Sequence, residues 1–170
     1  MPTENERKWV LTIESERKIK RRPDCVIHIR QGYLILSKGM SLRVREEQQN
    51  GKTRYKFCYK QKVNGRVIEI EKKIDKRDFD DLWKIALNKL DKIRYVIGEW
   101  EVDYFYDHDN IYFAMAEIEM PEGETEPKKI PKFINDNLLY AVPVGDDNYS
   151  SKRISCVKHA KKIYLELANK

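Results

Sequence analysis

Two glutamates and a lysine stand at alternate positions near the start of the chain, in the run Glu4-Asn5-Glu6-Arg7-Lys8. Successive side chains of a β-strand point to opposite faces, so a strand here would present Glu4, Glu6 and Lys8 on one face. Carboxylates are hard oxygen ligands for Mg²⁺ or Mn²⁺, and a lysine ammonium binds phosphate as a point charge. This spacing therefore suits metal-assisted phosphate chemistry, provided that other strands supply the partners.

The same alternation of charged and apolar residues recurs along the chain, and the charges mostly come as like-signed pairs two residues apart. The acidic members are Glu4, Glu6, Glu69, Glu71, Glu101, Asp103, Glu117 and Glu119. The basic members are Lys8, Arg43, Arg45, Lys60, Lys62, Lys92 and Arg94. A sheet with one solvated face would also alternate, but like charges repel, and such a face has no reason to prefer like-signed pairs. A barrel whose charged faces line its interior would explain the pairs, and it would gather both signs of charge for phosphoryl transfer.

The elements that must position these residues are mainly strands. Alternation predicts strands over residues 4–14, 26–36, 42–45, 53–62, 67–71, 92–97, 99–105 and 112–120. The dipeptides Asn50-Gly51 and Asn64-Gly65 predict hairpin turns between neighbouring strands. The basic stretch from Arg17 to Pro23 has the composition of a loop.

Three stretches are predicted to be helical instead. From Asp75 the apolar residues follow the spacing of an amphipathic helix, and the last of them is Leu90. Residues 131–138 predict a short helix that opens on a proline. A second amphipathic pattern predicts a closing helix at about residues 152–169. The predicted fold class is therefore α+β and mainly β, with a few helices packed outside the strands.

The composition limits the classes of protein that are possible. The length of 170 residues fits a single domain over residues 1–170. A net charge of +6, from 34 basic and 28 acidic residues, is compatible with anionic partners without being extreme. The three cysteines form no CxxC pair, so neither a structural zinc site nor a disulfide framework is expected. No signal-peptide pattern and no membrane-length apolar run is present, which predicts a cytoplasmic protein with no membrane partner.

These motifs together resemble the CYTH superfamily, also called the triphosphate tunnel metalloenzymes. Its hallmark is ExExK on the first strand, matched here by Glu4-x-Glu6-x-Lys8, and the later charged pairs follow the family's order over about residues 4–152. The resemblance implies a closed eight-stranded antiparallel barrel, a tunnel with a polar interior.

The resemblance also implies roles for individual residues. The metal ligands would be Glu4, Glu6 and Glu117, and Glu119 with Glu101 or Asp103 would serve a second metal or position the attacking water. The residues that hold the phosphates would be Lys8, Arg43, Arg45, Lys60, Lys92 and Arg94.

Two further segments bear on catalysis. The run Arg30-Gln31-Gly32-Tyr33-Leu34 resembles a segment of short bacterial inorganic triphosphatases, in which a tyrosine and a lysine activate water; Tyr33 and Lys60 hold the matching positions. The family's final phosphate-binding loop is altered here, because Asn148 stands where arginine is common, although Lys152 is still expected to reach the phosphates.

The predicted function is hydrolysis of a triphosphate with Mg²⁺ or Mn²⁺, with inorganic tripolyphosphate cleaved to pyrophosphate and phosphate as the favoured reaction. The alternatives are a class IV adenylate cyclase, a thiamine, nucleoside or RNA triphosphatase, and a module that binds nucleotide or polyphosphate without turnover. The expected partner is a small-molecule triphosphate. No specific nucleic acid is expected, because no RNP-like, helix-turn-helix or zinc pattern occurs, and the protein would be a monomer or a homodimer.

Overall fold

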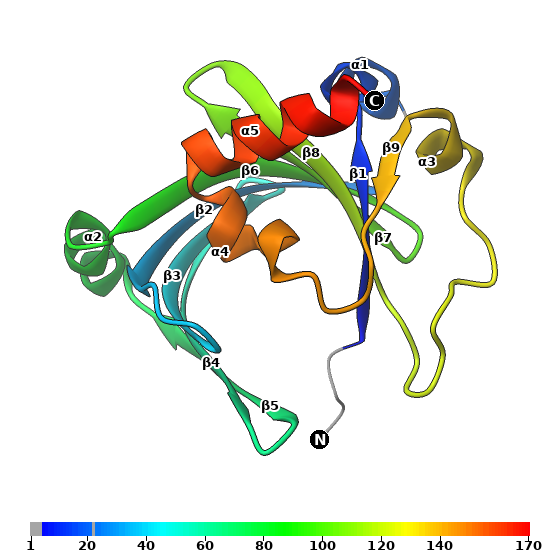
Figure 1. Ribbon diagram of the computed structural model, residues 1–170. Coiled ribbons are helices and arrows are strands. Elements are labelled where there is room, and N and C mark those ends of the chain that lie inside the picture. Colours follow the sequence, from blue (N-terminus) through cyan, green and yellow to red (C-terminus); the bar gives the residue numbers. More distant parts are fainter. Residues whose placement is uncertain (1–4, 22) are drawn as a thin grey trace. The chain divides into compact units, whose positions relative to one another are not determined.

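The computed structural model describes residues 5–21 and 23–170 (Figure 1). Within these residues the chain forms nine β-strands, and every strand pairing with a defined register is antiparallel. The described residues pack as two compact units, a terminal unit of residues 5–21, 23–26 and 92–170 and a middle unit of residues 27–91. The prediction of a mainly β protein with few helices is confirmed.

The middle unit is a meander whose strands are hydrogen-bonded in the order β5-β4-β3-β2. Its strands are most of β2 (Cys25–Ile35), β3 (Met40–Gln49), β4 (Lys52–Val63) and β5 (Arg66–Ile74). Both predicted hairpin turns are confirmed. Asn50 and Gly51 have φ values of 49° and 72°, and Asn64 and Gly65 have 49° and 77°; two successive positive φ angles are what a type I′ turn requires.

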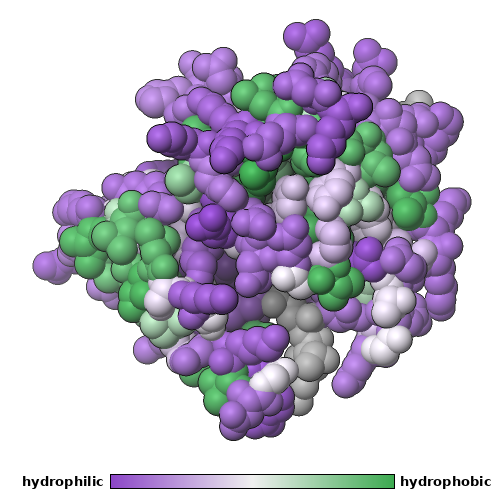
Figure 2. Space-filling view, viewed as in Figure 1, coloured by the Kyte–Doolittle hydropathy of each residue, from purple (hydrophilic) through white to green (hydrophobic). Residues whose placement is uncertain are grey.

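Helix α2 (Lys76–Lys84) covers one face of this meander. It begins where Asp75 caps it, with the side-chain carboxylate accepting a hydrogen bond from the Asp78 N–H at 2.8 Å. Phe79 is buried, and its ring lies 5.1 Å from that of Tyr55 on β4. Hydrophobic side chains gather over α2 at the left of Figure 2. The helix lies on the Gly32 side of β2, so the neighbouring Gln31 and Tyr33 side chains belong to the opposite face.

The predicted helix was too long at its C-terminal end. It stops at Lys84, and Leu90 lies on β6 (Asn88–Ile97), where it is buried as a strand residue. The backbone N–H of Leu87 donates to the Tyr33 carbonyl at 2.8 Å, so from here the chain satisfies its backbone groups by pairing with another strand. The apolar spacing of a helix continues to Leu90, but pairing with another strand determines the structure after Lys84.

Gly32 is required where α2 approaches β2. A Cβ on Gly32 would lie 2.9 Å from the Ala86 Cβ and 3.1 Å from the Trp83 ring, so alanine overpacks this contact. We expect Gly32→Ala to lower the free energy of unfolding by about 1–3 kcal/mol, measured by urea denaturation. The double variant Gly32→Ala/Ala86→Gly should recover part of that loss; a double variant no more stable than Gly32→Ala would contradict the steric explanation.

The terminal unit is a second antiparallel series, in the order β6-β7-β8-β1-β9. Besides β6 its strands are β1 (Glu6–Leu11), β7 (Trp100–Asp107), β8 (Asn110–Glu119) and β9 (Leu138–Ala141). Its helices are α1 (Glu16–Ile19), α3 (Lys132–Asp136), α4 (Ser151–Ile154) and α5 (Val157–Ala168), with 3₁₀ turns η1 (Ile13–Ser15) and η2 (Asp147–Tyr149). The short helix predicted at 131–138 is thus present as α3, and the helix predicted at about 152–169 is divided into α4 and α5.

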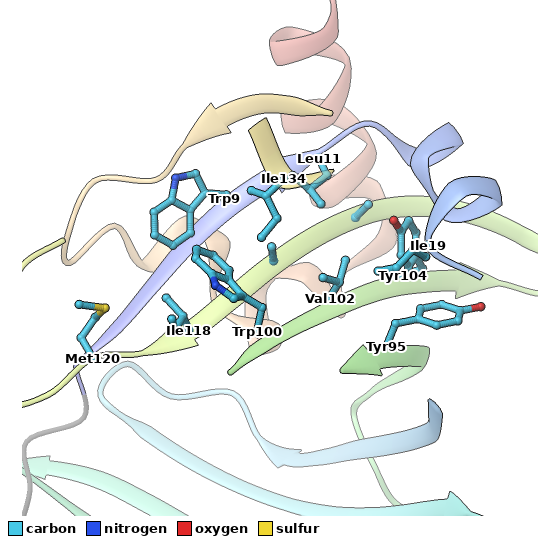
Figure 3. Packing of buried hydrophobic residues seen from close by; sticks show 12 residues of the cluster. Trp9, Leu11, Ile19, Tyr95, Trp100, Val102, Tyr104, Ile118, Met120 and Ile134 are labelled. Atoms are coloured by element: carbon cyan, nitrogen blue, oxygen red, sulfur yellow. The ribbon is translucent and has the colours of Figure 1, made fainter. Parts of the chain in front are cut away.

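One face of this sheet packs a hydrophobic core (Figure 3). Its members on the strands and on the elements over them are Trp9, Leu11, Ile19, Tyr95, Trp100, Val102, Tyr104, Ala114, Ala116, Ile118, Met120 and Ile134. The Trp9 and Trp100 rings lie 4.9 Å apart. Because side chains alternate along a strand, the charged residues between these positions belong to the other face.

The stretch Arg17–Pro23 is not only loop, as its composition indicated, because α1 occupies its first turn. Ile19 is buried in the core, and the Glu16 carboxylate accepts hydrogen bonds from the hydroxyls of Tyr95 at 3.0 Å and Tyr106 at 2.5 Å. These long-range contacts hold a four-residue helix that local sequence does not signal.

Of the predicted barrel, the antiparallel pairing of its strands and the small number of helices are confirmed. The described residues form nine strands rather than eight, and the additional one is the short β9. The series of the middle unit has β5 at one end, and the series of the terminal unit has β9 at one end. Closure into a barrel and action as a single domain stay predictions. None of the described helices has the length and apolarity needed to cross a membrane.

Candidate functional site

The charged side of the terminal unit is one candidate surface, here called the terminal charged face. It comprises Glu6, Lys8, Lys92, Arg94, Glu101, Asp103, Glu117 and Glu119. Strand register aligns most of them, since Glu6 lies opposite Glu119, Lys8 opposite Glu117, and Glu101 opposite Glu117. Eight of the residues predicted from the sequence are therefore brought together on four strands. Glu4, the remaining predicted metal ligand, lies outside the described residues.

Like charges face each other on this surface. Glu6 against Glu119 and Glu101 against Glu117 are carboxylate pairs at directly opposite positions, an arrangement that is destabilising unless cations offset it. Lys8 offsets part of it, with its Nζ 3.3 Å from Glu6 Oε2 and 3.6 Å from Glu117 Oε1. Arg94 adds a contact of 3.6 Å from Nη2 to Glu117 Oε2. The surface thus keeps its carboxylates close and interleaves them with cationic side chains.

Asp103 is the buried anchor of two of these cations. Its side chain is 0% exposed and that of Lys92 is 1% exposed, and Lys92 Nζ lies 2.5 Å from Asp103 Oδ2. Arg94 grips the same carboxylate as a fork, from Nε to Oδ1 at 2.7 Å and from Nη2 to Oδ2 at 2.8 Å. Both Asp103 oxygens are therefore engaged by cations, which fixes where Lys92 and Arg94 are held.

The pKa values of this network follow from burial and charge. Burial alone would raise the pKa of Asp103, but Arg94 and then Lys92 outweigh it and hold that pKa well below its usual range. Burial would lower the pKa of Arg94, yet Asp103, Glu117 and Glu101 together raise it. Glu101 behaves differently: burial raises its pKa, and Asp103 and Glu117 raise it further against the opposing effect of Arg94. The surroundings of Glu101 therefore favour its protonated form.

The donors on this face suit a divalent cation that takes most of its ligands from other molecules. Within residues 5–21 and 23–170, no three acidic, histidine or cysteine side chains form a ready-made metal cluster. Mg²⁺ is commonly held by only one or two protein carboxylates, the remaining ligands being phosphate oxygens and water. The opposed Glu6 and Glu119, oxygen donors whose repulsion a cation would relieve, are such a pair.

The middle unit carries a second surface, the middle charged face. It comprises Gln31, Tyr33, Arg43, Arg45, Glu47, Lys56, Cys58, Lys60, Glu69 and Glu71. Strand register places Tyr33 beside Arg43, Arg43 beside Cys58, and Cys58 beside Glu71. Lys60 lies two residues further along β4, opposite Glu69 on β5. The four predicted residues of this unit, Tyr33, Arg43, Arg45 and Lys60, therefore share one face.

Tyr33 is packed into this face, with 1% of its surface exposed. Its hydroxyl accepts a hydrogen bond from Gln31 Nε2 at 2.6 Å, and Gln31 Oε1 accepts one from Arg45 Nε at 2.7 Å. Burial raises the pKa of Tyr33, and the nearby Arg43 and Arg45 offset only part of that effect. The phenol is consequently protonated at neutral pH, so it can orient groups or donate a hydrogen bond but cannot act as a phenolate base.

The acids of the middle face neutralise part of its positive charge. Lys56 Nζ lies 2.9 Å from Glu71 Oε1 and 3.3 Å from Glu47 Oε2, and the Cys58 thiol donates to Glu71 at 3.3 Å. Glu69 Oε1 lies 3.8 Å from Arg43 Nη2. Arg43 Nε is buried and makes no hydrogen bond within the described residues, so this guanidinium retains a donor that an anion would satisfy.

The altered final loop lies in the terminal unit. Asn148 is held locally, because its Nδ2 donates to Asp146 Oδ1 at 2.9 Å within the 3₁₀ turn η2. Lys152 lies on α4, where burial, with a contribution from Arg153, lowers its pKa despite the opposing charge of Asp147. The loop therefore offers a partly buried cation but no arginine at position 148.

Sequence reasoning missed Gln31, which joins Tyr33 to Arg45 and is fully buried. The alternation pattern selects charged residues, and Gln31 is uncharged. The available signal was its position two residues before Tyr33 on the same predicted strand, since a buried polar side chain at such a place needs partners on its own face.

No protein-family model and no curated protein sequence matches the chain. Among solved structures, the PH1012 protein of Pyrococcus horikoshii OT3 is similar, at 19% identity and a TM-score of 0.52, over 72% of this chain and 81% of that one. A Bacillus halodurans protein described as a candidate adenylate cyclase is similar at 16% identity and a TM-score of 0.51, over 72% of this chain and 82% of that one. Over about that share of its length, the chain shares its fold with these two proteins.

Proposed function

We propose that the protein is a divalent-metal-dependent triphosphatase of the CYTH type, which cleaves inorganic tripolyphosphate to pyrophosphate and phosphate. One observation supports this above the others: the terminal charged face sets Glu6 opposite Glu119 and places Lys8 and Arg94 within 3.6 Å of Glu117. Carboxylates for a metal and cations for phosphate on one surface are what phosphoryl transfer needs, because its chemistry is mainly positioning and charge neutralisation. The closed eight-stranded barrel of that superfamily is part of the proposal.

The residues have separate roles in this proposal. Glu6, Glu117 and Glu119, with Glu4, would hold Mg²⁺ or Mn²⁺, which when bound neutralises charge on the phosphate oxygens. Lys8, Lys92 and Arg94 would bind phosphate oxygens, and Asp103 would keep the last two of these cations in place.

The middle charged face would contribute the forked donors of Arg43 and Arg45 to phosphate binding. Lys60, in its uncharged amine form, would take the proton from the attacking water, and the neutral Tyr33 hydroxyl would orient that water. Gln31 would fix Arg45 and Tyr33 in this role, since it bonds to both.

Phosphate release from a panel of triphosphates tests the proposal. The purified chain is incubated with tripolyphosphate, ATP and thiamine triphosphate, each with Mg²⁺, with Mn²⁺ or with EDTA, and phosphate is measured with malachite green. We expect tripolyphosphate to be cleaved fastest, and only with metal. Failure to release phosphate from every triphosphate with either metal would contradict the proposal.

A second candidate is adenylate cyclase activity, because one protein of the same fold is described as a candidate cyclase. A cyclase would use a similar grip on the triphosphate but would release pyrophosphate and cyclic AMP from ATP. Chromatography of the ATP reactions distinguishes the two, since ADP and phosphate indicate hydrolysis and cyclic AMP indicates cyclisation. Tight binding of tripolyphosphate without any product would instead indicate a binding module.

A further inference from the structure

The residues between the charges of β1 have no role in the proposed function, yet they make specific contacts. Arg7 lies on β1, and Asn5 directly precedes it and continues its pairing with β8 through the Met120 N–H, so alternation assigns both to the face opposite Glu6 and Lys8. Both reach the loop that follows β8, residues 121–126. All of these residues belong to the terminal unit.

Asn5 holds the near end of this loop. Its Nδ2 donates to the carbonyls of Pro121 at 2.9 Å and Glu124 at 2.7 Å, so both amide hydrogens can be used. Its carbonyl accepts a hydrogen bond from the Met120 N–H at 2.8 Å, and its own N–H lies 3.5 Å from Glu119 Oε1. One residue therefore connects the start of β1, the end of β8 and the loop.

Arg7 holds the far end of the loop. Its Nη1 donates to the Thr125 carbonyl in a short hydrogen bond and lies 2.6 Å from Glu126 Oε1. Its guanidinium also lies over the Trp9 ring, with Cζ 5.7 Å from the ring centroid. The Arg7 side chain is only 10% exposed, whereas that of Glu126 is 65% exposed, so the guanidinium is shielded from water although its ion-pair partner is not.

The Asn5 and Arg7 contacts lie at the N-terminal end of β1, next to the opposed Glu6 and Glu119. Glu6 and Glu119 are the first register pair of β1 with β8, at a strand end, where chains fray most easily. Their like charges push the same end apart. An attachment on the other face of β1 resists both effects, and its one contact with the pair is the Asn5 N–H, which lies 3.5 Å from Glu119 Oε1.

We propose that Asn5 and Arg7 are positioning residues, forming a latch on loop 121–126 that keeps Glu6 opposite Glu119 for a divalent cation. This inference rests on the proposed function, because it takes that carboxylate pair to be part of the metal site. The latch explains why a polar loop is tied to the back of the strand that carries the metal-binding acids.

Metal affinity and backbone protection test the latch in the full chain. The variants are Asn5→Ala, Arg7→Met and the double variant. Free Mn²⁺ is measured by electron paramagnetic resonance, and amide exchange over residues 6–10 and at Met120 is followed by mass spectrometry. We expect the double variant to bind Mn²⁺ roughly tenfold more weakly, as loss of outer-shell support to metal ligands does, and its β1 amides to exchange faster. Arg7→Lys, which retains the charge opposite Glu126, should recover part of the affinity.

Lys132→Met is the matched control, because it removes an exposed cation that pairs with Asp136 on α3 of the same unit; both measurements should stay at the wild-type value. The latch is overturned if exchange quickens in the variants while Mn²⁺ affinity holds, since the contacts would then be structural only. It is also overturned if exchange is unchanged, or if the wild type binds Mn²⁺ no better than Glu119→Gln. Asn5→Ala, the mildest change, decides the matter should the double variant not fold. A wild type that binds Mn²⁺ but hydrolyses no triphosphate overturns the proposed function and leaves the latch standing.

Discussion

Replacing Glu119 by glutamine is expected to lower metal-dependent hydrolysis of tripolyphosphate by at least about 100-fold, since even outer-shell changes at metal sites cost roughly 10–100-fold. Glutamine retains the size of the side chain but removes the charge that makes the carboxylate a ligand for Mg²⁺. It also removes one member of the Glu6/Glu119 pair, so the metal-free protein should be no less stable than the wild type. Loss of activity with retained stability is the signature of a ligand rather than of a structural residue. The measurements are phosphate release, Mn²⁺ binding and thermal unfolding without metal.

Glu122→Gln is the matched control for this experiment. Glu122 is an exposed glutamate three residues further along, in the loop after β8, and it belongs to no opposed pair in the described strands. Its variant should retain wild-type activity and Mn²⁺ affinity. If Glu119→Gln retains both as well, Glu119 does not bind the metal. If it loses stability along with activity, its charge serves the fold instead.

The strand-level pattern could be predicted from the sequence because strands and hairpins are determined locally. Two positive φ angles in a row are easy for Asn-Gly and costly for most other pairs, so Asn50-Gly51 and Asn64-Gly65 were identified correctly. Alternation likewise predicts which residues share a face, and it grouped Lys8, Glu117 and Arg94, which the structure places together. These are properties of one strand at a time.

The errors lie where distant residues decide the structure. α1 forms within a basic stretch because Glu16 accepts hydrogen bonds from Tyr95 and Tyr106, which lie 79 and 90 positions away. α2 ends before Leu90 because the backbone at Leu87 pairs with Tyr33. In neither case does the local sequence show the distant partner that determines where the helix forms or ends.

The candidate site shows the same division. Alternation places Asp103 among the acids, but it does not reveal that Lys92 and Arg94 take up both of its oxygens. Nor does it single out Asn5 and Arg7, whose partners lie in a loop more than a hundred residues away. A face can be predicted from spacing; the partner of each charge depends on tertiary packing.

Asp103→Asn is expected to lower the free energy of unfolding by about 3–5 kcal/mol, because it leaves buried cations without their carboxylate. Asp103 is 0% exposed, Lys92 is 1% exposed, and Arg94 donates to both Asp103 oxygens. Asparagine is similar in size and can accept one hydrogen bond, so the loss comes from the missing charge rather than from a cavity. The measurement is urea denaturation at pH 7 of wild type and variant.

The dependence on pH tests this cause directly. The pKa of Asp103 is lowered in the folded protein from an ordinary value of 3.8, so its stabilising effect is complete above about pH 5 and is lost as the pH falls below 3.8 towards the folded value. The difference between wild type and Asp103→Asn should therefore be constant from pH 8 to pH 5 and should shrink by pH 3. Asp136→Asn, which breaks the exposed pair with Lys132 on α3, is the control and should change stability little at any pH. A difference for Asp103→Asn as small as that of the control would show that the buried cations do not depend on this carboxylate, and a large difference that does not shrink by pH 3 would point to packing rather than charge.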